Sequence, residues 1–344
     1  MKTMNVVGVD LGSHSVKVVQ LENSDTGSKL IGCASKEIFS GKEYNPEGPT
    51  ADQILETLNA CLTEAKVNPK KVKALVTSIG GQSTHVKQIK SVPLSAEELN
   101  SSLIFEARKH LPLDEEQPLL DFQILRGDAN STDMDVMLVA TSRKAFDKHR
   151  EILKDTGFQV DEAIIDVDVL ALANAFLMQK KVDNDGLTII LEIGARSSNI
   201  LVIGKDSPFF SRSIQVGGHK ITEDLAETKK MTYLDAENFK KSNNIFETKT
   251  EGDGLSLQMV QKNSYEQLLE ELKRSLRYYA KENSNSAFKE VLICGGGAKI
   301  PGFVEFINKN LNLTTSAYNP MALVSGGVAD TQYTQAVGLA LRRE

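Results

Sequence analysis

Two apolar stretches near the start of the chain, joined by a short polar turn, constrain the fold more than any other part of the sequence. Residues 6–9 and 16–19 are mainly valine, and Asp10 and the turn Gly-Ser-His-Ser lie between them. Because β-branched residues favour strands, we predict a β-hairpin over residues 6–21. The carboxylate before the glycine suits a phosphate group with a magnesium ion, and the same pattern also fits an ordinary hairpin turn without a ligand.

The residue types of this first hairpin suggest a role for each position. The glycine lets an anion approach the backbone, whose amides can point at phosphate oxygens. Asp10 is the candidate magnesium ligand, acting through water, because a carboxylate beside a phosphate-binding turn is otherwise an electrostatic liability. A lysine on the returning strand can add a positive charge to the same phosphate. The candidate phosphate-binding residues are Gly12, Ser13, His14, Ser15 and Lys17.

Residues 187–203 repeat this pattern. An apolar strand ends in Glu192, an apolar residue and a glycine follow, and a small polar turn leads into another apolar strand. Two such hairpins can clamp a triphosphate from opposite sides, and they indicate a duplicated fold. Glu192 is the second candidate magnesium ligand. The candidate phosphate-binding residues of this hairpin are Gly194, Ala195, Arg196 and Ser197.

A third motif combines an apolar strand, residues 291–294, with a run of three glycines and the start of a helix. Such a turn suits a flat nucleoside lying against the backbone. Consecutive glycines are costly in chain entropy, which favours either a ligand or a tight turn as their reason. The candidate nucleoside-binding residues are Gly295, Gly296, Gly297 and Lys299.

The composition limits the function classes. With 46 acidic and 40 basic residues the net charge is -6, which gives no reason to expect nucleic-acid binding. Cys33, Cys61 and Cys294 follow no disulfide or metal-ligand spacing, which fits a reducing cytoplasm. No stretch offers the roughly 20 apolar residues that a membrane-spanning helix needs. We therefore expect any membrane association to come through a partner.

Taken in this order, the two hairpins and the glycine turn resemble the phosphate and adenosine motifs of the actin, sugar-kinase and chaperone ATPase superfamily. More closely, the chain resembles the PilM family of actin-like proteins in type IV pilus assembly over nearly its whole length. The likeness includes residues 94–99, 105–112, 165–168, 274–279 and 336–342. It implies an α/β, actin-like (ribonuclease H-like) fold, with duplicated domains around a nucleotide cleft, and ATP and Mg²⁺ as cofactors.

The predicted domain organisation follows from this likeness and from the pattern of apolar residues. Residues 1–84 form the first actin-like subdomain, and residues 85–160 form a small inserted α+β subdomain. Residues 161–344 form the second actin-like half, whose last helix, about 332–342, returns to the first half. Apolar spacing also predicts a long helix from about residue 257 to residue 281.

The resemblance extends to catalysis and to adenine binding. The residue at this connection orients an attacking water in related ATPases, so the resemblance implies this role for Asp166 or Asp168. An equally open interpretation is that these two aspartates cap the following helix. Glu192 replaces the usual aspartate and is one methylene longer, so we expect weak or no ATPase activity. For Lys273 and Arg274, the alternative is that they lie on a solvated helix face. The candidate residues around the adenine are Gly217, Gly218, Lys220, Glu223, Lys273 and Arg274.

Family likeness also implies a specific partner. The extended cytoplasmic N-terminal peptide of the inner-membrane protein PilN docks beside the insertion in this family. We therefore expect a cytoplasmic ATP-binding scaffold, peripheral at the inner membrane, which also contacts other pilus assembly proteins and forms a homo-oligomer. The candidate groove residues are Leu103, Phe105, Leu111 and Pro112.

Two alternative functions follow from the same superfamily. A small-molecule kinase would need a substrate pocket and a catalytic base in the cleft, and neither is visible in the sequence. An FtsA-like filament anchor would carry a basic amphipathic tail after the fold, whereas this chain shows only Arg342-Arg343-Glu344 after its last predicted helix.

Overall fold

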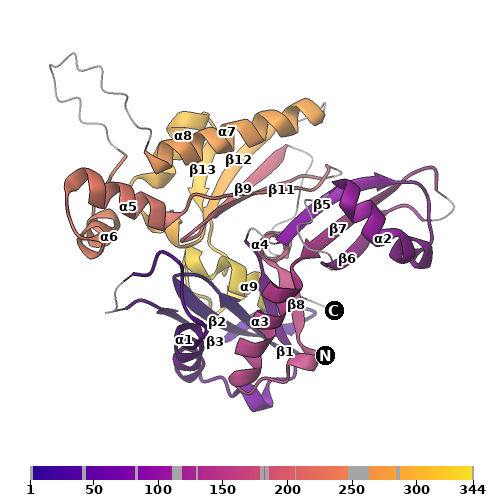
Figure 1. The fold of residues 1–344 in the computed structure, drawn as a ribbon, viewed down its shortest axis with the longest axis horizontal. Helices are drawn as coiled ribbons and strands as arrows, with labels where there is room; N and C mark the ends of the chain where they lie inside the picture. Colours follow the sequence, from indigo (N-terminus) through magenta and orange to yellow (C-terminus); the bar gives the residue numbers. More distant parts are fainter. Residues whose placement is uncertain are drawn as a thin grey trace.

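Two β-sheets, one in each half of the protein, lie on either side of a cleft, and a third, smaller sheet projects from the first half (Figure 1). The computed structural model describes residues 3–40, 44–81, 84–110, 118–128, 131–178, 182, 186–205, 207–246, 263–283 and 287–342. Within these ranges, no helix is both long enough and apolar enough to cross a membrane.

The first sheet has six strands in the order β14-β3-β2-β1-β4-β8. The predicted hairpin is confirmed, since β1 and β2 pair antiparallel with Asp10 opposite Lys17. One face packs on α1 and α3, and the other packs on α9. The elements are β1 (Met4–Leu11), β2 (Ser15–Ser24), β3 (Gly27–Glu37), β4 (Leu75–Ile79), β8 (Ile164–Val167), β14 (Val324–Ser325), α1 (Ala51–Glu64), α3 (Arg143–Asp155) and α9 (Thr334–Ala340).

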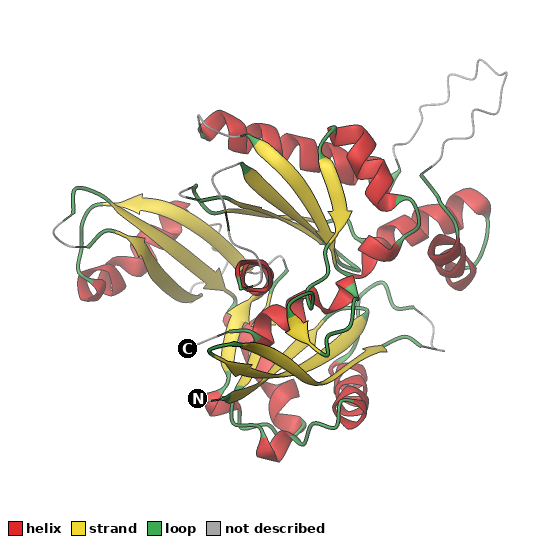
Figure 2. Cartoon of the chain, turned by 180° about the vertical axis from the view of Figure 1, so that it is seen from behind, coloured by secondary structure: helices red, strands yellow, loops and turns green. Residues whose placement is uncertain are grey.

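The second sheet has five strands in the order β11-β10-β9-β12-β13. Its largest apolar cluster lies against α7 and α8, whereas α4 packs on the opposite face (Figure 2). The predicted second hairpin is confirmed as β9 and β10. The elements are β9 (Leu187–Ile193), β10 (Ser198–Ile203), β11 (Phe210–Ile214), β12 (Phe288–Cys294), β13 (Thr314–Ala317), α4 (Asp168–Leu177), α5 (Gly218–Lys229), α6 (Tyr233–Ser242), α7 (Ser264–Glu282) and α8 (Phe303–Leu311).

Helices α4 and α9 pack against each other between the two sheets (Figure 1). A side chain at Gly338 in α9 would collide with the carbonyl group of Ala171 in α4, so a glycine is needed for this close contact. The helix pair therefore connects the two halves beneath the cleft. The long helix predicted from residue 257 begins at Ser264 in the described chain, where the side chain of Asn263 caps it, and residues 257–262 lie outside the described residues.

The third sheet is antiparallel, in the order β5-β7-β6, and α2 covers one face. This insertion is shorter than the predicted range 85–160. Ile152, Leu153 and Phe158 join the core of the first sheet, because the apolar side of α3 packs on α1 and β4. The elements are β5 (Thr84–Ser91), α2 (Ala96–His110), β6 (Leu119–Arg126) and β7 (Met134–Thr141).

Candidate functional site

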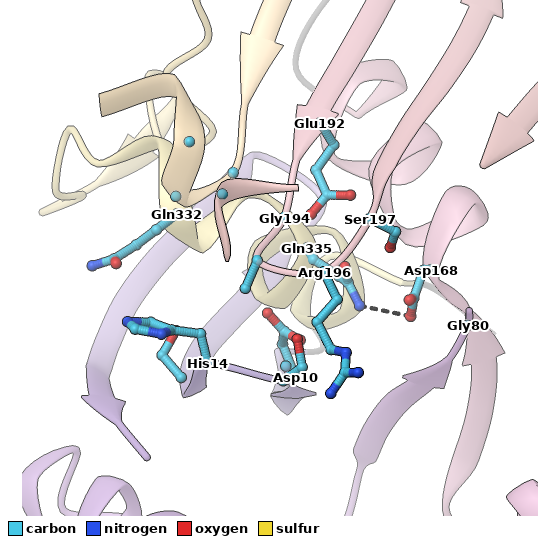
Figure 3. A pocket seen from close by; sticks show the side chains of 18 of the residues that line it. Asp10, His14, Gly80, Asp168, Glu192, Gly194, Arg196, Ser197, Gln332 and Gln335 are labelled. Atoms are coloured by element: carbon cyan, nitrogen blue, oxygen red, sulfur yellow. Dashed lines mark hydrogen bonds between the residues drawn. The ribbon is translucent and has the colours of Figure 1, made fainter. Parts of the chain in front are cut away.

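A cavity of about 1190 Å³ lies between the two halves, and it is lined by residues from both hairpin turns (Figure 3). Its walls also include the first residue of α4, part of α6, the glycine turn and the start of α9. This volume is ample for a ligand of nucleotide size, since ligand pockets span roughly 300–1,000 Å³. The cavity is the candidate functional site of the protein.

The first hairpin places a paired carboxylate in this cavity. Asp10 and Lys17 are cross-strand neighbours, and the Lys17 Nζ lies 3.0 Å from the Asp10 Oδ2 with both side chains nearly buried. A Cβ at Gly12 would lie 2.7 Å from the Ser15 carbonyl oxygen, so the turn closes only around a glycine. All six predicted ligand-binding residues of this hairpin line the cavity: Asp10, Gly12, Ser13, His14, Ser15 and Lys17.

The second hairpin has the same geometry, but a different residue lies opposite its carboxylate. Asn199 is the cross-strand neighbour of Glu192, and its Nδ2 donates a hydrogen bond of 2.7 Å to the Glu192 Oε2. The Gly194 amide donates to the Ser197 carbonyl oxygen at 3.0 Å, which closes the turn. The predicted residues of this hairpin all line the cavity: Glu192, Gly194, Ala195, Arg196 and Ser197.

A third carboxylate, Asp168, stands at the start of α4. The Gln335 Nε2 donates to the Asp168 Oδ1 at 2.7 Å, and a side chain at Gly80 would collide with this carboxylate (Figure 3). Burial raises the pKa of Asp168 to about 6, and the charge of Asp10 adds to the shift. Burial likewise raises the pKa of Glu192 to about 7, with Asp168 and Asp10 adding to it. A cation in the cavity would relieve this crowding of negative charge.

Of the two aspartates predicted to orient a water molecule, only Asp168 lines the cavity among the described residues. Asp166 is buried and is held by an ion pair with Arg342 at the end of α9, and its Oδ1 accepts a hydrogen bond from the Val167 amide. The alternative capping role does not apply, because Val167 occupies the N-cap position of α4. The prediction for Asp166 is corrected to a structural role that ties β8 to α9.

Helix α6 contributes three charged residues to the cavity that sequence reasoning missed. The Lys240 Nζ donates to the Gly218 carbonyl oxygen at 2.9 Å, to the Thr222 Oγ1 at 2.6 Å and to the Glu237 Oε2 at 2.6 Å. Burial alone would raise the pKa of Glu237, but the charge of Lys240 and the hydrogen bonds that Glu237 accepts from Lys240 and Thr222 lower it to about 2. The only signal was their spacing on one helix face, which surface helices share. These residues are Glu237, Lys240 and Lys241.

Five of the six residues predicted around the adenine do not line this cavity in the described structure. Lys220 pairs with Glu223 at 3.3 Å on an exposed face of α5. Helix α7 packs its apolar side on the second sheet, away from the cavity, so Lys273 and Arg274 fit the alternative of a solvated face. Gly218 lines the cavity, and Gly217 packs against the second hairpin turn, where a Cβ would lie 2.6 Å from the Ala195 carbonyl oxygen.

Two of the three glycines after β12 are needed, each for a different structural reason, and the third leaves space there. Gly295 has a φ of 81°, which a glycine adopts without strain, and a side chain at Gly297 would collide with Ile193. A Cβ at Gly296 would meet nothing within 4 Å, so this position leaves open space in the cavity wall. Lys299 also lines the cavity, and its Nζ lies 2.9 Å from the Asp330 Oδ2.

These residues fit a magnesium nucleotide by their donor chemistry. The hairpin turns present backbone amides, and the cavity holds Asp10, Asp168 and Glu192. Across the described residues, no group of three or more histidine, cysteine or carboxylate side chains is placed to hold a metal ion by itself. That arrangement suits magnesium, which keeps several water ligands and binds through one or two carboxylates and substrate phosphates.

The predicted partner groove is only partly described. Leu103 is buried in the core between α2 and the small sheet, which corrects its assignment as a groove residue, whereas Phe105 is 64% exposed. Leu111 and Pro112 lie outside the described residues. A second cavity of about 430 Å³ lies between β5 and β11, on the flank of the small sheet, and it adjoins Gly80 and Asp168.

The chain matches the family described as type IV pilus assembly protein PilM over residues 8–344. The cell division protein FtsA of Borreliella burgdorferi is 23% identical to it over 386 residues, covering 98% of this chain and 90% of FtsA. The structure is similar to a PilM-PilN type IV pilus biogenesis complex, with a TM-score of 0.79, 20% identity and 98% of both chains covered. It is also similar to MreB 5 of Spiroplasma citri bound to AMPPNP, with a TM-score of 0.52, 12% identity and coverage of 98% and 95%. These similarities confirm the predicted actin-like α/β fold.

Proposed function

The chain belongs to the PilM family of type IV pilus assembly proteins, and we propose that it is an ATP-binding scaffold of that machinery. In this proposal the protein is cytoplasmic, binds ATP with Mg²⁺, and is held at the inner membrane by a PilN-like protein. Contacts with other pilus assembly proteins and with further copies of the chain belong to the same proposal.

The observation that carries nucleotide binding is the pair of hairpins. Both turns close around a glycine, both place a carboxylate beside the turn, and both line one cavity. This is the arrangement that two clamps on a polyphosphate require. The AMPPNP bound to MreB 5, a structure of similar fold, supports the same conclusion.

Weak hydrolysis follows from the carboxylates in the cavity. Asp168 is the residue best placed to orient a water molecule, but its Oδ1 already accepts a hydrogen bond from Gln335. Glu192 accepts a hydrogen bond from Asn199, and its side chain is one methylene longer than that of an aspartate. We therefore expect the bound nucleotide to set a conformation rather than to be consumed rapidly.

Calorimetric titration of the full chain with ATP and magnesium, together with an assay of phosphate release, tests this function. Asp10→Asn should weaken binding by about 10- to 100-fold, the loss expected for a charged contact worth about 1.5–3 kcal/mol. Lys220→Ala is the matched control, because Lys220 lies on an exposed face of α5, and its affinity should stay within about twofold. Absence of binding to the unmodified protein would refute the nucleotide proposal.

For the partner, we propose that the N-terminal peptide of a PilN-like protein docks in the second cavity. Its walls include residues from β5 and β11, which are edge strands of two different sheets. An extended peptide can pair with such an edge through its main chain. The PilM-PilN complex of similar structure supports a partner of this kind.

Fluorescence anisotropy with that peptide distinguishes the two candidate surfaces. Ser213→Trp introduces bulk at an exposed position of β11 that lines the second cavity, and it should abolish or strongly weaken binding. Phe105→Ala removes an exposed side chain of α2 and should leave the affinity unchanged. The opposite result would move the peptide to the α2 surface.

A second candidate function, assembly into FtsA-like filaments, is favoured by the sequence similarity to FtsA over 98% of the chain. Pelleting of the protein with ATP, with and without lipid vesicles, tests it. Sedimentation that needs vesicles but no partner protein would favour the filament anchor over the scaffold.

A further inference from the structure

Six residues from the two halves meet on one flank of the nucleotide cavity, and we call them the clasp. Glu37, Tyr44 and Pro46 come from the end of β3 and the connection to α1. Arg196 comes from the second hairpin turn, and Tyr233 and Lys241 come from α6. The opposite flank is bridged separately, where the Phe209 amide donates to the Gln88 Oε1 at 2.6 Å.

The centre of the clasp is an aromatic stack. The rings of Tyr44 and Tyr233 lie 4.2 Å apart between centroids, with only 7° between their planes. On the first-half side, Tyr44 makes an edge contact with Phe39, which belongs to the core of the first sheet. On the second-half side, Tyr44 also packs on the buried ring of His219, with centroids 4.4 Å apart. Tyr44 therefore connects the first core to the wall formed by α5 and α6.

Two polar contacts reinforce this stack. The Lys241 Nζ lies 3.0 Å from the Glu37 Oε1 across the halves, and 3.6 Å from the Glu237 Oε1 within α6. The Arg196 NH2 donates to the Pro46 carbonyl oxygen at 2.6 Å. A side chain at Gly48 would lie against the Arg196 guanidinium, so a glycine there leaves room for this contact.

The clasp and the cavity share residues. Glu37, Arg196 and Lys241 line the cavity and also make the contacts between the halves. Tyr44 and Tyr233 are not among the described residues that line it. A ligand in the cavity would therefore meet one side of the clasp, while the tyrosine stack closes the same flank from outside.

We propose that the clasp is the gate of the nucleotide cavity, and that its opening limits both the entry and the release of the nucleotide. This inference rests on the proposed nucleotide-binding function. Because the contacts of the stack join the two halves, they are lost when this flank opens, and weakening them raises the population of the open state. A gate acts on both rates, whereas a residue that touches the ligand acts mainly on release.

Stopped-flow fluorescence of the full chain with a fluorescently labelled ATP and magnesium tests the gate. Tyr44→Ala should raise the association and dissociation rate constants together by about 3- to 10-fold, the range expected for an aromatic pair, with a much smaller change in Kd. Tyr44→Phe keeps the stacked ring and should restore the rates of the unmodified protein. Tyr233→Ala added to Tyr44→Ala should change the rate constants little further, because the stack is already lost, although it also removes the contact of the Tyr233 hydroxyl with the His219 Nδ1 inside the second half.

The alternative outcomes separate the two proposals. Unchanged rate constants in Tyr44→Ala, with tight binding in the unmodified protein, would overturn the gate alone. A faster dissociation with an unchanged association rate would also overturn it, since Tyr44 would then act as a ligand contact. Absence of binding to the unmodified protein would refute the nucleotide function and the gate with it. Thermal unfolding of Tyr44→Ala and Tyr44→Phe checks that both variants are folded.

Discussion

The two hairpins share one backbone design and differ in the residue opposite the carboxylate. Asp10 faces Lys17 across its hairpin, and Glu192 faces Asn199 at the corresponding register position. The first carboxylate thus has a nearly buried ammonium group 3.0 Å away, whereas the second accepts a hydrogen bond from an uncharged amide. Burial then raises the pKa of Glu192 to about 7. The two hairpins therefore share a turn geometry and differ in the charge of the group that faces the carboxylate.

The largest expected effect comes from removing the ammonium partner. Lys17→Met leaves the buried carboxylate of Asp10 without its counter-charge, so the free energy of unfolding should fall by about 3 kcal/mol. Asn199→Ala in the second hairpin removes a single hydrogen bond and should cost only about 1–2 kcal/mol. Urea unfolding of both variants measures the difference, and equal losses would contradict the distinction drawn between the hairpins.

The shared backbone design predicts equal effects for the two turn glycines. A Cβ would lie 2.7 Å from the Ser15 carbonyl oxygen at Gly12, and 2.8 Å from the Ser197 carbonyl oxygen at Gly194. Gly12→Ala and Gly194→Ala should each lower the free energy of unfolding by about 1–3 kcal/mol through this crowding. Chemical denaturation measures these free energies of unfolding. A lower stability in only one of the two variants would show that the turns are not equivalent.

The second hairpin should also make stability depend on pH. Because burial raises the pKa of Glu192 to about 7, the folded protein keeps a proton that the unfolded chain releases above its ordinary value of 4.5. Stability therefore falls as the pH rises from about 4.5 to about 7, and this contribution levels off above that range. In Glu192→Gln the fall should be smaller, although Asp168, with a pKa of about 6, still contributes.

Denaturant titrations at about pH 5 and about pH 8 check this prediction, because they bracket the titration of Glu192. A matched series on Asn199→Ala is informative, since the lost hydrogen bond favours the charged form and its removal should raise the pKa further. The same pH dependence in the unmodified protein and in Glu192→Gln would rule out this carboxyl as its source.

The smallest effect is expected from the turn side chains. Ser13→Ala gives the first turn the residue that Ala195 provides in the second. Since we assign phosphate binding to the backbone amides, the affinity for ATP should change less than about threefold, and stability by about 0.5 kcal/mol or less. Calorimetric titration measures the affinity. A large loss of affinity would show that the first turn binds the nucleotide through the Ser13 hydroxyl group.

Much of the fold was readable from the sequence because its signals are local. Strand residues such as Val16 and Val18, which follow a glycine turn, identify a hairpin without knowledge of the rest of the chain. The insertion was harder to delimit. The apolar stripe of α3 predicts a buried face, but no local signal shows that Leu153 packs in the core of the first sheet rather than on the small sheet.

The residues of the candidate site also fall into those that a local sequence pattern predicts and those that only tertiary packing brings together. The turn residues were predicted because they lie next to one another in the sequence, whereas Lys240 was missed because surface helices carry the same charge pattern. Asp166 and Asp168 looked equivalent, yet only Asp168 lines the cavity, since Arg342 holds Asp166 against the end of α9. The family resemblance placed Leu103 in a groove, and it is instead buried between α2 and the small sheet.

The sequence by itself determined the two hairpin turns, their carboxylates and the duplicated order of the halves, because each depends on neighbouring residues and on strand or turn propensity. Only the tertiary structure decided which charged groups share the cavity and which residues close its flank. Tyr44 and Tyr233, like Asp168 and Gln335, are far apart in the chain. Their contact depends on how two sheets and the α4–α9 pair pack together, and no local pattern encodes that distance.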